Sequence, residues 1–576
     1  MIDQRNTILA IVVSLLILVA WEYFFVTAPE PGPSPPASQE TRPDVSMSSP
    51  LKAPNDISAI GITTPETSNE VNRTIALDSS QRVKINTDSL HGTLSLKGAR
   101  FDDITLAKYR DTPEQESDEI VLLSPAQAPN PYYAELGWVS ADTSLALPKS
   151  DSLWSKTSKN TVLTPEQSIT LTWNGGQNLT FTRTISVDED YMFTVIEEVS
   201  NNASEPVTLF PYGLVARLDT PDTLGFFILH EGPLGVFNDT LKEVDYEDIR
   251  DDGDISMETT GGWIGFTDKY WLTALAFDQS TSATAGFRHT LRSGRDRYQT
   301  DFRGNAMELP ANGNISIKTH FFAGAKEVEL LDGYAKNLGV SRFDLAIDFG
   351  WFYFLTKPFF YSLIWLRDQL GNFGLAIIAF TVFLRLLVFP LANKQYRAMT
   401  KLKALQPEMK QLQERYANDR PRLNQELMEL YKREKANPAS GCLPILVQIP
   451  VFFALYKVLF VSIEMRQAPF YGWIKDLSAP DPTSVFNLFG LLPYDVPSFL
   501  TIGAWPIIMG ITMWLQQKIN PQIADPLQAK IMSFLPVIFT VLLATFPAGL
   551  VIYWAWSNAL GILQQWVIMR RANVRA

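Results

Sequence analysis

The stretch GLAIIAFTVFLRLLVFPL, Gly374 to Leu391, organises this chain. It is apolar over a length that can cross a bilayer, and its single charged residue is Arg385. At a rise of ~1.5 Å per residue, Arg385 lies roughly 13 Å deeper than Lys394, the first basic residue after the run. An arginine in hydrocarbon costs about 2.5 to 3.5 kcal/mol on insertion scales, so such residues usually face a cavity or a partner. The sequence therefore predicts a functional arginine, and a side chain that reaches back to the headgroups is the alternative.

Charge divides the chain into two unlike halves. Residues 357–576 carry 22 basic and 12 acidic side chains, a formal charge of +10, which leaves −22 for residues 1–356 out of a net −12. The single cysteine, Cys442, excludes a disulfide within the chain, and all four histidines lie in the acidic half without the spacing of metal ligands. We therefore expect two regions that meet different environments, and no metal or other cofactor.

Three regions precede the apolar run. Residues 1–26 contain an apolar segment from Thr7, which we interpret as an uncleaved membrane anchor. A cleaved signal peptide is the alternative, but the segment is longer than a signal core and lacks a clear cleavage site. Residues 27–72 are rich in Pro, Ser and Thr and predict a disordered linker. Residues 73–340 show short alternating runs, such as LTFTRTISV from Leu179, which predict a soluble β domain built as a two-sheet sandwich.

Residues 341–576 predict a helical membrane region. An interfacial amphipathic helix leads into the span of Arg385, and a basic loop at 392–442 predicts a cytoplasmic helical hairpin. Four further apolar runs lie at 443–463, about 498–515, 531–546 and 550–569. With the first anchor these make six transmembrane helices, with both termini in the cytoplasm and the acidic β domain outside.

Few polar residues interrupt these runs, and none of them is an acid that pairs with Arg385. They are Gln448, Lys457, Thr512, Thr540, Thr545, Ser557, Asn558, Gln564 and Gln565. An unpaired buried charge is costly, so water or a transient anionic partner must compensate the arginine. The chain shows no metalloprotease, hydrolase, nucleotide-binding or carboxylate-relay motif, which argues against an enzyme and against an ion pump.

Four segments closely resemble the YidC family of bacterial membrane protein insertases, within the wider YidC/Oxa/Alb group. They are TVFLRLLVFP around Arg385, NPASGCLPILVQIPVFFALYKVL from Asn437, EMRQAPF from Glu464 and FPAGLVIYW from Phe546. The first anchor, the linker and a large outer domain containing GGWIGFTDKYW are similar to the Gram-negative form. The resemblance implies an α-helical polytopic protein of the inner membrane, with six transmembrane helices and a periplasmic all-β supersandwich domain.

The resemblance also implies a mechanism without enzymatic chemistry. In the family a hydrophilic groove, open to the cytosol and to lipid, receives the polar tail of a nascent segment. The matching groove residues here are Arg385, Thr381, Gln448, Tyr553 and Trp554. Trp554 stands where a tyrosine is expected, and Lys457 stands where an uncharged residue is expected, so we read Lys457 as a side chain that reaches the outer interface.

The implied partners are nascent membrane proteins, the Sec translocon (SecYEG and SecDF), membrane lipids and the ribosome, but not DNA. The ribosome would be met through the hairpin and the basic C-terminal tail at Arg570, Arg571 and Arg575. A solvated charged face is an equally good interpretation of the hairpin from its residues alone. The alternative function is a solute or lipid transporter whose outer domain binds the ligand.

Overall fold

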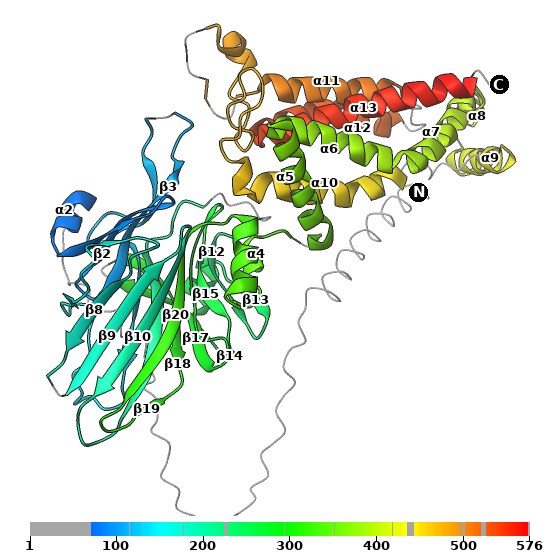
Figure 1. The fold of residues 1–576 in the computed structure, drawn as a ribbon. Helices are drawn as coiled ribbons and strands as arrows, with labels where there is room; N and C mark the ends of the chain where they lie inside the picture. Colours follow the sequence, from blue (N-terminus) through cyan, green and yellow to red (C-terminus); the bar gives the residue numbers. More distant parts are fainter. Residues whose placement is uncertain are drawn as a thin grey trace, which may run out of the picture.

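The computed structural model describes residues 71–573 apart from gaps at 115, 177, 224–228, 293, 351, 417–418, 435–442, 493, 495, 498–500 and 520–525. The predicted anchor at 1–26, nearly all of the predicted linker at 27–72, and Arg575 lie outside the described residues. The described chain forms a β domain followed by a helical region, which lie against each other in Figure 1.

Two mainly antiparallel sheets make up the β domain, and only β1 and β7 pair in parallel among the described strands. The 11-stranded sheet has the order β14 (Ile255–Thr260), β17 (Ser282–Arg292), β18 (Arg295–Gly304), β11 (Val207–Leu218), β5 (Tyr132–Val139), β3 (Arg100–Arg110), β2 (Leu90–Ser95), β1 (Arg82–Asn86) and β7 (Val162–Leu163), with β19 (Met307–Leu309) on β11 and β4 (Glu119–Leu123) on β3. The 9-stranded sheet has the order β13 (Thr240–Glu243), β12 (Gly232–Phe237), β15 (Trp263–Thr267), β16 (Trp271–Ala276), β20 (Asn314–Ala325), β10 (Met192–Asn201), β9 (Leu179–Val187), β8 (Ile169–Asn174) and β6 (Ser155–Lys156). Short helices α2 (Arg73–Asp78) and α3 (Tyr246–Asp252) flank the sheets.

The alternation of β9 shows why the sheets pack face to face. Its odd-numbered residues are buried and its threonines and serine are half-buried, as the run LTFTRTISV predicts. Arg183 lies in the buried row, where Nε and Nη2 donate to Glu197 Oε1 at 3.1 and 2.6 Å. The same guanidinium donates to the carbonyl oxygens of Ala99 and Leu136 in or beside the opposite sheet, at 3.0 and 2.5 Å. A buried cation is tolerated here because a carboxylate and two carbonyls replace its hydration.

The helical region follows α4 (Val328–Asn337) and the short turn η3 (Phe343–Ala346). Its longer helices are α5 (Tyr353–Leu370), α6 (Phe373–Leu387), α7 (Phe389–Ala404), α8 (Gln406–Arg415), α9 (Arg420–Arg433), α10 (Leu443–Val461), α11 (Ala504–Ile519), α12 (Pro526–Leu542) and α13 (Ala548–Asn573). Three short turns, η5 (Ile463–Met465), η6 (Val485–Gly490) and η8 (Leu543–Thr545), lie between them.

The apolar run of Arg385 is divided, contrary to the expectation of one continuous helix. Helix α6 ends at Leu387 and α7 begins at Phe389, with Val388 at the junction. Pro390 accounts for the break, because it has no N–H to donate to the Leu386 carbonyl, so the helical ladder loses a bond at this point. Within the described part of the chain, no helix has the length and apolarity that a membrane crossing requires.

The predicted hairpin forms from α8 and α9, and Asp419 caps α9 by accepting from the N–H of Arg422 at 3.2 Å. Its small core contains Leu405, Met409, Leu427 and Leu430. The first arm is not one continuous helix, because it breaks at Leu405, two residues before Pro407 at the start of α8.

Candidate functional site

Arg385 reaches from α6 to α13. Its Nη2 donates to the Ser557 carbonyl oxygen at 2.8 Å and to the Ser557 hydroxyl at 2.7 Å. Ser557 is buried, whereas the arginine is half-buried. Among the described residues, no carboxylate forms an ion pair with Arg385, so the cation is held by neutral oxygens.

Further polar side chains of α11 and α13 lie beside Arg385 or next to Ser557 along the chain. Gln564 Nε2 donates to the Arg385 carbonyl at 3.3 Å, and Asn558 Nδ2 donates to Thr512 Oγ1 at 3.5 Å. Gly561 lies beside the guanidinium and the Gln516 amide: a Cβ there would be in ordinary contact with the terminal nitrogens of Arg385 at 3.6 Å, but tight against Gln516 Nε2 at 3.2 Å. We call this set the Arg385 cluster: Arg385, Thr512, Gln516, Ser557, Asn558, Gly561 and Gln564.

The other predicted groove residues are distributed around this cluster. Thr381, one turn before Arg385 on α6, is buried, and its hydroxyl donates to the Ile377 carbonyl at 2.6 Å. Tyr553, one turn before Ser557 on α13, is also buried. These two residues share helix faces with Arg385 and Ser557, because residues four apart lie on one side of a helix. Gln448 belongs to α10, but its side chain lies outside the described residues.

Trp554 lies three residues before Ser557 on α13. Its ring packs against Phe452 of α10 and Phe539 of α12, with centroid distances of 4.9 and 5.4 Å. The Trp554 ring therefore supplies apolar contact between three helices.

Lys457 forms an ion pair that the sequence did not predict. Its Nζ lies 2.5 Å from Asp348 Oδ2, in the segment before α5. Lys457 lies near the C-terminal end of α10, the end that contacts the β domain through Phe460, but its ammonium group pairs with a carboxylate instead of extending alone toward the outer interface.

The β domain contacts the helical region through residues 464–467, which we call the EMRQ segment. We call this contact the seam. Glu464 Oε1 accepts from the Val328 N–H at 3.2 Å, where α4 begins. Arg466 Nη2 and Gln467 Nε2 donate to the Arg110 carbonyl at the end of β3, at 2.6 and 2.9 Å. From the β domain, Lys269 lies 4.0 Å from the ring centroid of Phe460 at the end of α10. Sequence reasoning missed this seam, because backbone carbonyls and amides as partners leave no signal in side-chain patterns.

The aromatic stretch Gly261 to Phe277 contributes to both core and seam. Trp263 and Phe266 are buried in the β-domain core. Trp271 instead lies under the Arg466 guanidinium, 5.4 Å from the ring centroid. The stretch therefore also contributes Trp271 to the contact between the β domain and the helical region of this chain.

Glu464→Gln should raise the melting temperature of the chain more at pH 8 than at pH 5. Burial raises the pKa of Glu464 to about 7, the charge of Glu327 adds to the rise, and Arg367 opposes it. Because this pKa is above the ordinary glutamate value, the folded state loses stability as the pH rises from about 4.3 to about 7, and the loss remains above that range. The neutral amide avoids the loss, so the variant should melt at least about 2 °C higher at pH 8. Thermal unfolding of the purified chain at both pH values measures this.

Glu329→Gln, an exposed glutamate on α4, is the matched control and should change neither value. If Glu464→Gln shifts the melting temperature equally at pH 5 and pH 8, ionisation of Glu464 does not destabilise the folded chain.

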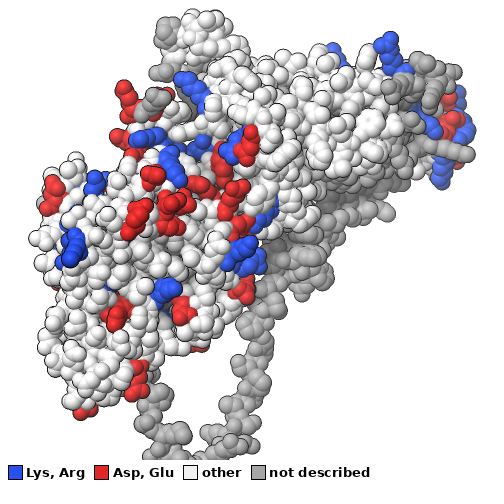
Figure 2. Space-filling view, viewed as in Figure 1, with Lys and Arg blue, Asp and Glu red and all other residues white. Residues whose placement is uncertain are grey.

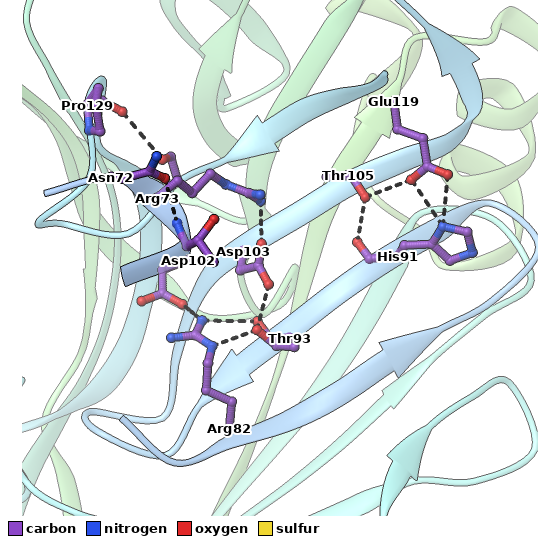
Figure 3. Close-up of polar contacts among 12 residues, drawn as sticks. Asn72, Arg73, Arg82, His91, Thr93, Asp102, Asp103, Thr105, Glu119 and Pro129 are labelled. Atoms are coloured by element: carbon purple, nitrogen blue, oxygen red, sulfur yellow. Dashed lines mark hydrogen bonds and ion pairs between the residues drawn. The ribbon is translucent and has the colours of Figure 1, made fainter. Parts of the chain in front are cut away.

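Polar networks on the β domain are structural. In Figure 3, Arg73 of α2 pairs with Asp103 of β3, Arg82 of β1 pairs with Asp102 of β3, and Thr93 of β2 donates to Asp103 at 2.5 Å. Glu119 accepts from Thr105 at 3.0 Å and lies 3.0 Å from His91 Nδ1. Across the described residues, no three His, Cys, Asp or Glu side chains come together as a metal site would require.

Charged side chains lie at the two ends of the molecule. Figure 2 shows them over the β domain and at the end formed by α8 and α9, while the helical flank between is almost free of them on this face. The exterior of α12 agrees, since its exposed large side chains include Phe534, Val537, Ile538 and Val541. The Arg385 cluster, whose members are buried or half-buried, thus lies in a helical region whose visible flank is mostly apolar.

Comparison with known proteins extends over the whole chain. Residues 82–362 match the family described as YidC periplasmic domain, and residues 365–575 match the family described as 60Kd inner membrane protein. A relative from Beijerinckia indica, named membrane protein insertase YidC, is 50% identical over 595 residues, covering 100% of this chain and 97% of the relative. Relatives of the same name from Methylorubrum extorquens and Rickettsia bellii are 47% and 46% identical, covering 100% and 98% of this chain and 96% and 98% of the relatives.

Solved structures give weaker similarity. An active YidC insertase with its first transmembrane domain resolved is 18% identical and covers 85% of this chain and 92% of its own, with a TM-score of 0.35. A galactose mutarotase related enzyme from Lactobacillus acidophilus is 8% identical and covers 42% of this chain and 97% of its own, with a TM-score of 0.29. The sequence matches carry the assignment, and by them the chain belongs to the YidC family of membrane protein insertases, with a β-rich periplasmic domain and a helical region of the inner membrane.

Proposed function

We propose that this chain is an insertase and membrane chaperone, which moves nascent transmembrane segments from the cytosol into the inner membrane, alone or beside the Sec translocon. The observation that carries the proposal is the Arg385 cluster. Its cation has neutral oxygens for partners among the described residues, so it keeps electrostatic attraction for an anionic group that arrives from outside.

The proposed membrane arrangement has six spans with both termini in the cytoplasm. Helix α6 with the start of α7 is the span of Arg385, helices α10, α11, α12 and α13 are four more, and residues 1–26 supply the sixth. The charge distribution supports this arrangement, since charges lie over the β domain and over α8 and α9. The β domain then lies in the periplasm and the hairpin in the cytoplasm.

The proposed groove contains Arg385, Thr381, Gln448, Tyr553 and Trp554. A polar tail that enters beside Arg385 exchanges part of its hydration for a cation and nearby amides, which lowers the cost of leaving water. Partition of the apolar segment then drives insertion, because each Leu, Ile, Phe or Val gains about 0.3 to 0.6 kcal/mol on insertion scales. No nucleotide hydrolysis is required.

The proposed partners follow from the same arrangement. The hairpin exposes charged residues of both signs, including Glu408 paired with Arg433 at 2.8 Å, and joins the helix of Arg385 to the helix of Gln448. We infer that the hairpin and the basic end of α13 meet ribosomes or anionic lipid heads, and that the Sec translocon docks beside the helical region.

Reconstitution tests the proposed function. The purified chain in vesicles of phosphatidylethanolamine and phosphatidylglycerol should insert a small two-span client, so that its translocated loop becomes protected from protease. A photoreactive residue at Gln516, in the Arg385 cluster, should cross-link to the client during insertion, whereas one at exposed Val537 on α12 should cross-link mainly to lipid. Capture of a small solute at Gln516, without client, would favour the transporter alternative. Vesicles that protect no more client than protein-free vesicles would overturn the proposal.

A further inference from the structure

Residues 482–494, between α10 and α11, contain no charged side chain. Their sequence is PTSVFNLFGLLPY, and we call the described residues of this segment, 482–492 and Tyr494, the η6 loop. Its large side chains are turned outward: Leu491 is 81% exposed, and Val485, Phe486, Leu488, Phe489, Leu492 and Tyr494 are exposed as well. Soluble surfaces rarely present such a continuous apolar group, so the loop is built to meet something other than water.

The loop satisfies its own backbone while it exposes these side chains. The Phe489 N–H donates to the Ser484 carbonyl at 2.7 Å, and the Leu492 N–H donates to the Asn487 carbonyl at 3.1 Å. Asn487 Oδ1 accepts from the Gly490 N–H at 3.0 Å. Leu488 and Phe489 adopt left-handed backbone, with φ of 52° and 59°, which is unusual for bulky residues. A loop whose backbone is paired internally can enter an apolar phase at a much lower cost than an open loop.

Asp481 fixes the loop to the start of α11. Its carboxylate is buried, and Oδ1 accepts from Trp473 Nε1 and from the Thr483 N–H, each at 3.0 Å. Its Oδ2 accepts from the Trp505 N–H at 2.9 Å. The loop therefore holds a defined position at this end of the helical region, which is also the end where Glu464 contacts the β domain.

The apolar surface of the loop continues the exterior of the neighbouring helices. Helix α11 exposes Ile508, Ile511, Trp514 and Leu515, and the packed helix α12 exposes further large apolar side chains along its length. Near the loop, Tyr471 and Trp473 are exposed too, and aromatic side chains of this kind are enriched where hydrocarbon meets headgroups. The rim of a protein interface is polar and usually includes charged residues, whereas residues 482–494 contain no charged side chain and their exposed large side chains are apolar or aromatic.

We propose that the η6 loop inserts into the periplasmic leaflet of the bilayer, at the boundary between headgroups and acyl chains. Lipid, rather than a second copy of the chain or another protein, is the occupant of this surface. The inference rests on the proposed function, because it requires α11 and α12 to lie in the membrane.

Single-cysteine reporters test the insertion. In a Cys442→Ser background, Leu491→Cys or Phe486→Cys is labelled with an environment-sensitive fluorophore, and the full chain is placed in phosphatidylethanolamine and phosphatidylglycerol vesicles with nitroxide-bearing acyl chains. Val537→Cys on α12 is the membrane control, and Leu291→Cys, 69% exposed on β17, is the aqueous control. We expect both loop reporters to lose at least half as much fluorescence as Val537→Cys does, and Leu291→Cys to lose none.

The outcomes separate this inference from the proposed function. If Val537→Cys is quenched and both loop reporters are not, the loop does not enter lipid and the inference fails alone. The inference also fails alone if the loop reporters are shielded from aqueous iodide without quenching by lipid nitroxides, because a protein would then cover them. If Val537→Cys is not quenched either, the membrane arrangement fails, and the proposed function fails with it.

Discussion

Arg385→Lys should retain much of the insertion activity, whereas Arg385→Ala and Arg385→Glu should lose at least about tenfold, most severely for clients with acidic tails. A tenfold loss corresponds to about 1.4 kcal/mol, which is modest for removal of a charge from a poorly hydrated site. Lysine keeps the positive charge and can still donate to an oxygen of Ser557. Glutamate would place a negative charge beside the Ser557 carbonyl and repel an anionic tail.

The measurement is protease protection of paired clients in vesicles that hold equal amounts of each variant. One client has an acidic tail, and in the other the acid is replaced by a neutral residue. If attraction matters, the neutral client should be partly rescued in Arg385→Ala. Ser557→Ala is the matched control, because it removes one acceptor of the guanidinium and keeps the carbonyl, so it should cost less than Arg385→Ala for both clients. If Arg385→Ala remains folded and loses insertion activity equally for both clients, electrostatic attraction of the tail is not the role of Arg385. Its remaining role would be to hydrate the groove.

The position of Arg385 was predictable from the sequence, but its partner was not. A lone cation in an apolar run stands out locally, whereas Ser557 lies 172 residues away and is one of several polar residues in its own run. Alternation predicted the sandwich core of the β domain, as in β9, since burial with a period of two is a local property. The same pattern could not show that Arg183 would stand in the buried row opposite Glu197.

Helix ends and domain contacts were the weakest predictions. The run from Gly374 to Leu391 was interpreted as one span, yet the helix is interrupted at Val388, because Pro390 lacks the N–H that would continue the helical ladder, a property that hydropathy does not report. The EMRQ segment was recognised only as a family signature. Its role in the seam depends on where Val328 and the end of β3 are brought by the fold, and that placement arises from tertiary packing.

Leu430→Glu should impair insertion at least fivefold while the remaining helices keep their arrangement. Leu430 is buried in the hairpin core with Met409 and Leu427, and a charge there removes an apolar contact and adds an unpaired ion. Loss of a buried leucine alone costs about 2 to 5 kcal/mol, which is more than two short helices joined by a tight turn can absorb. The hairpin should therefore open, as increased protease cleavage near Asp419 would show.

Met428→Glu is the matched control, because Met428 lies two residues earlier on α9 and is 52% exposed. It adds the same charge without entering the core, so it should leave both cleavage and insertion unchanged. If opening of the hairpin alone impairs insertion, the packed form receives the client at the mouth of the groove. If Met428→Glu impairs insertion as much as Leu430→Glu does, the surface charge of the hairpin, rather than its fold, governs the step. If Leu430→Glu opens the hairpin and insertion is unchanged, the hairpin is a passive connection between the helices of Arg385 and Gln448.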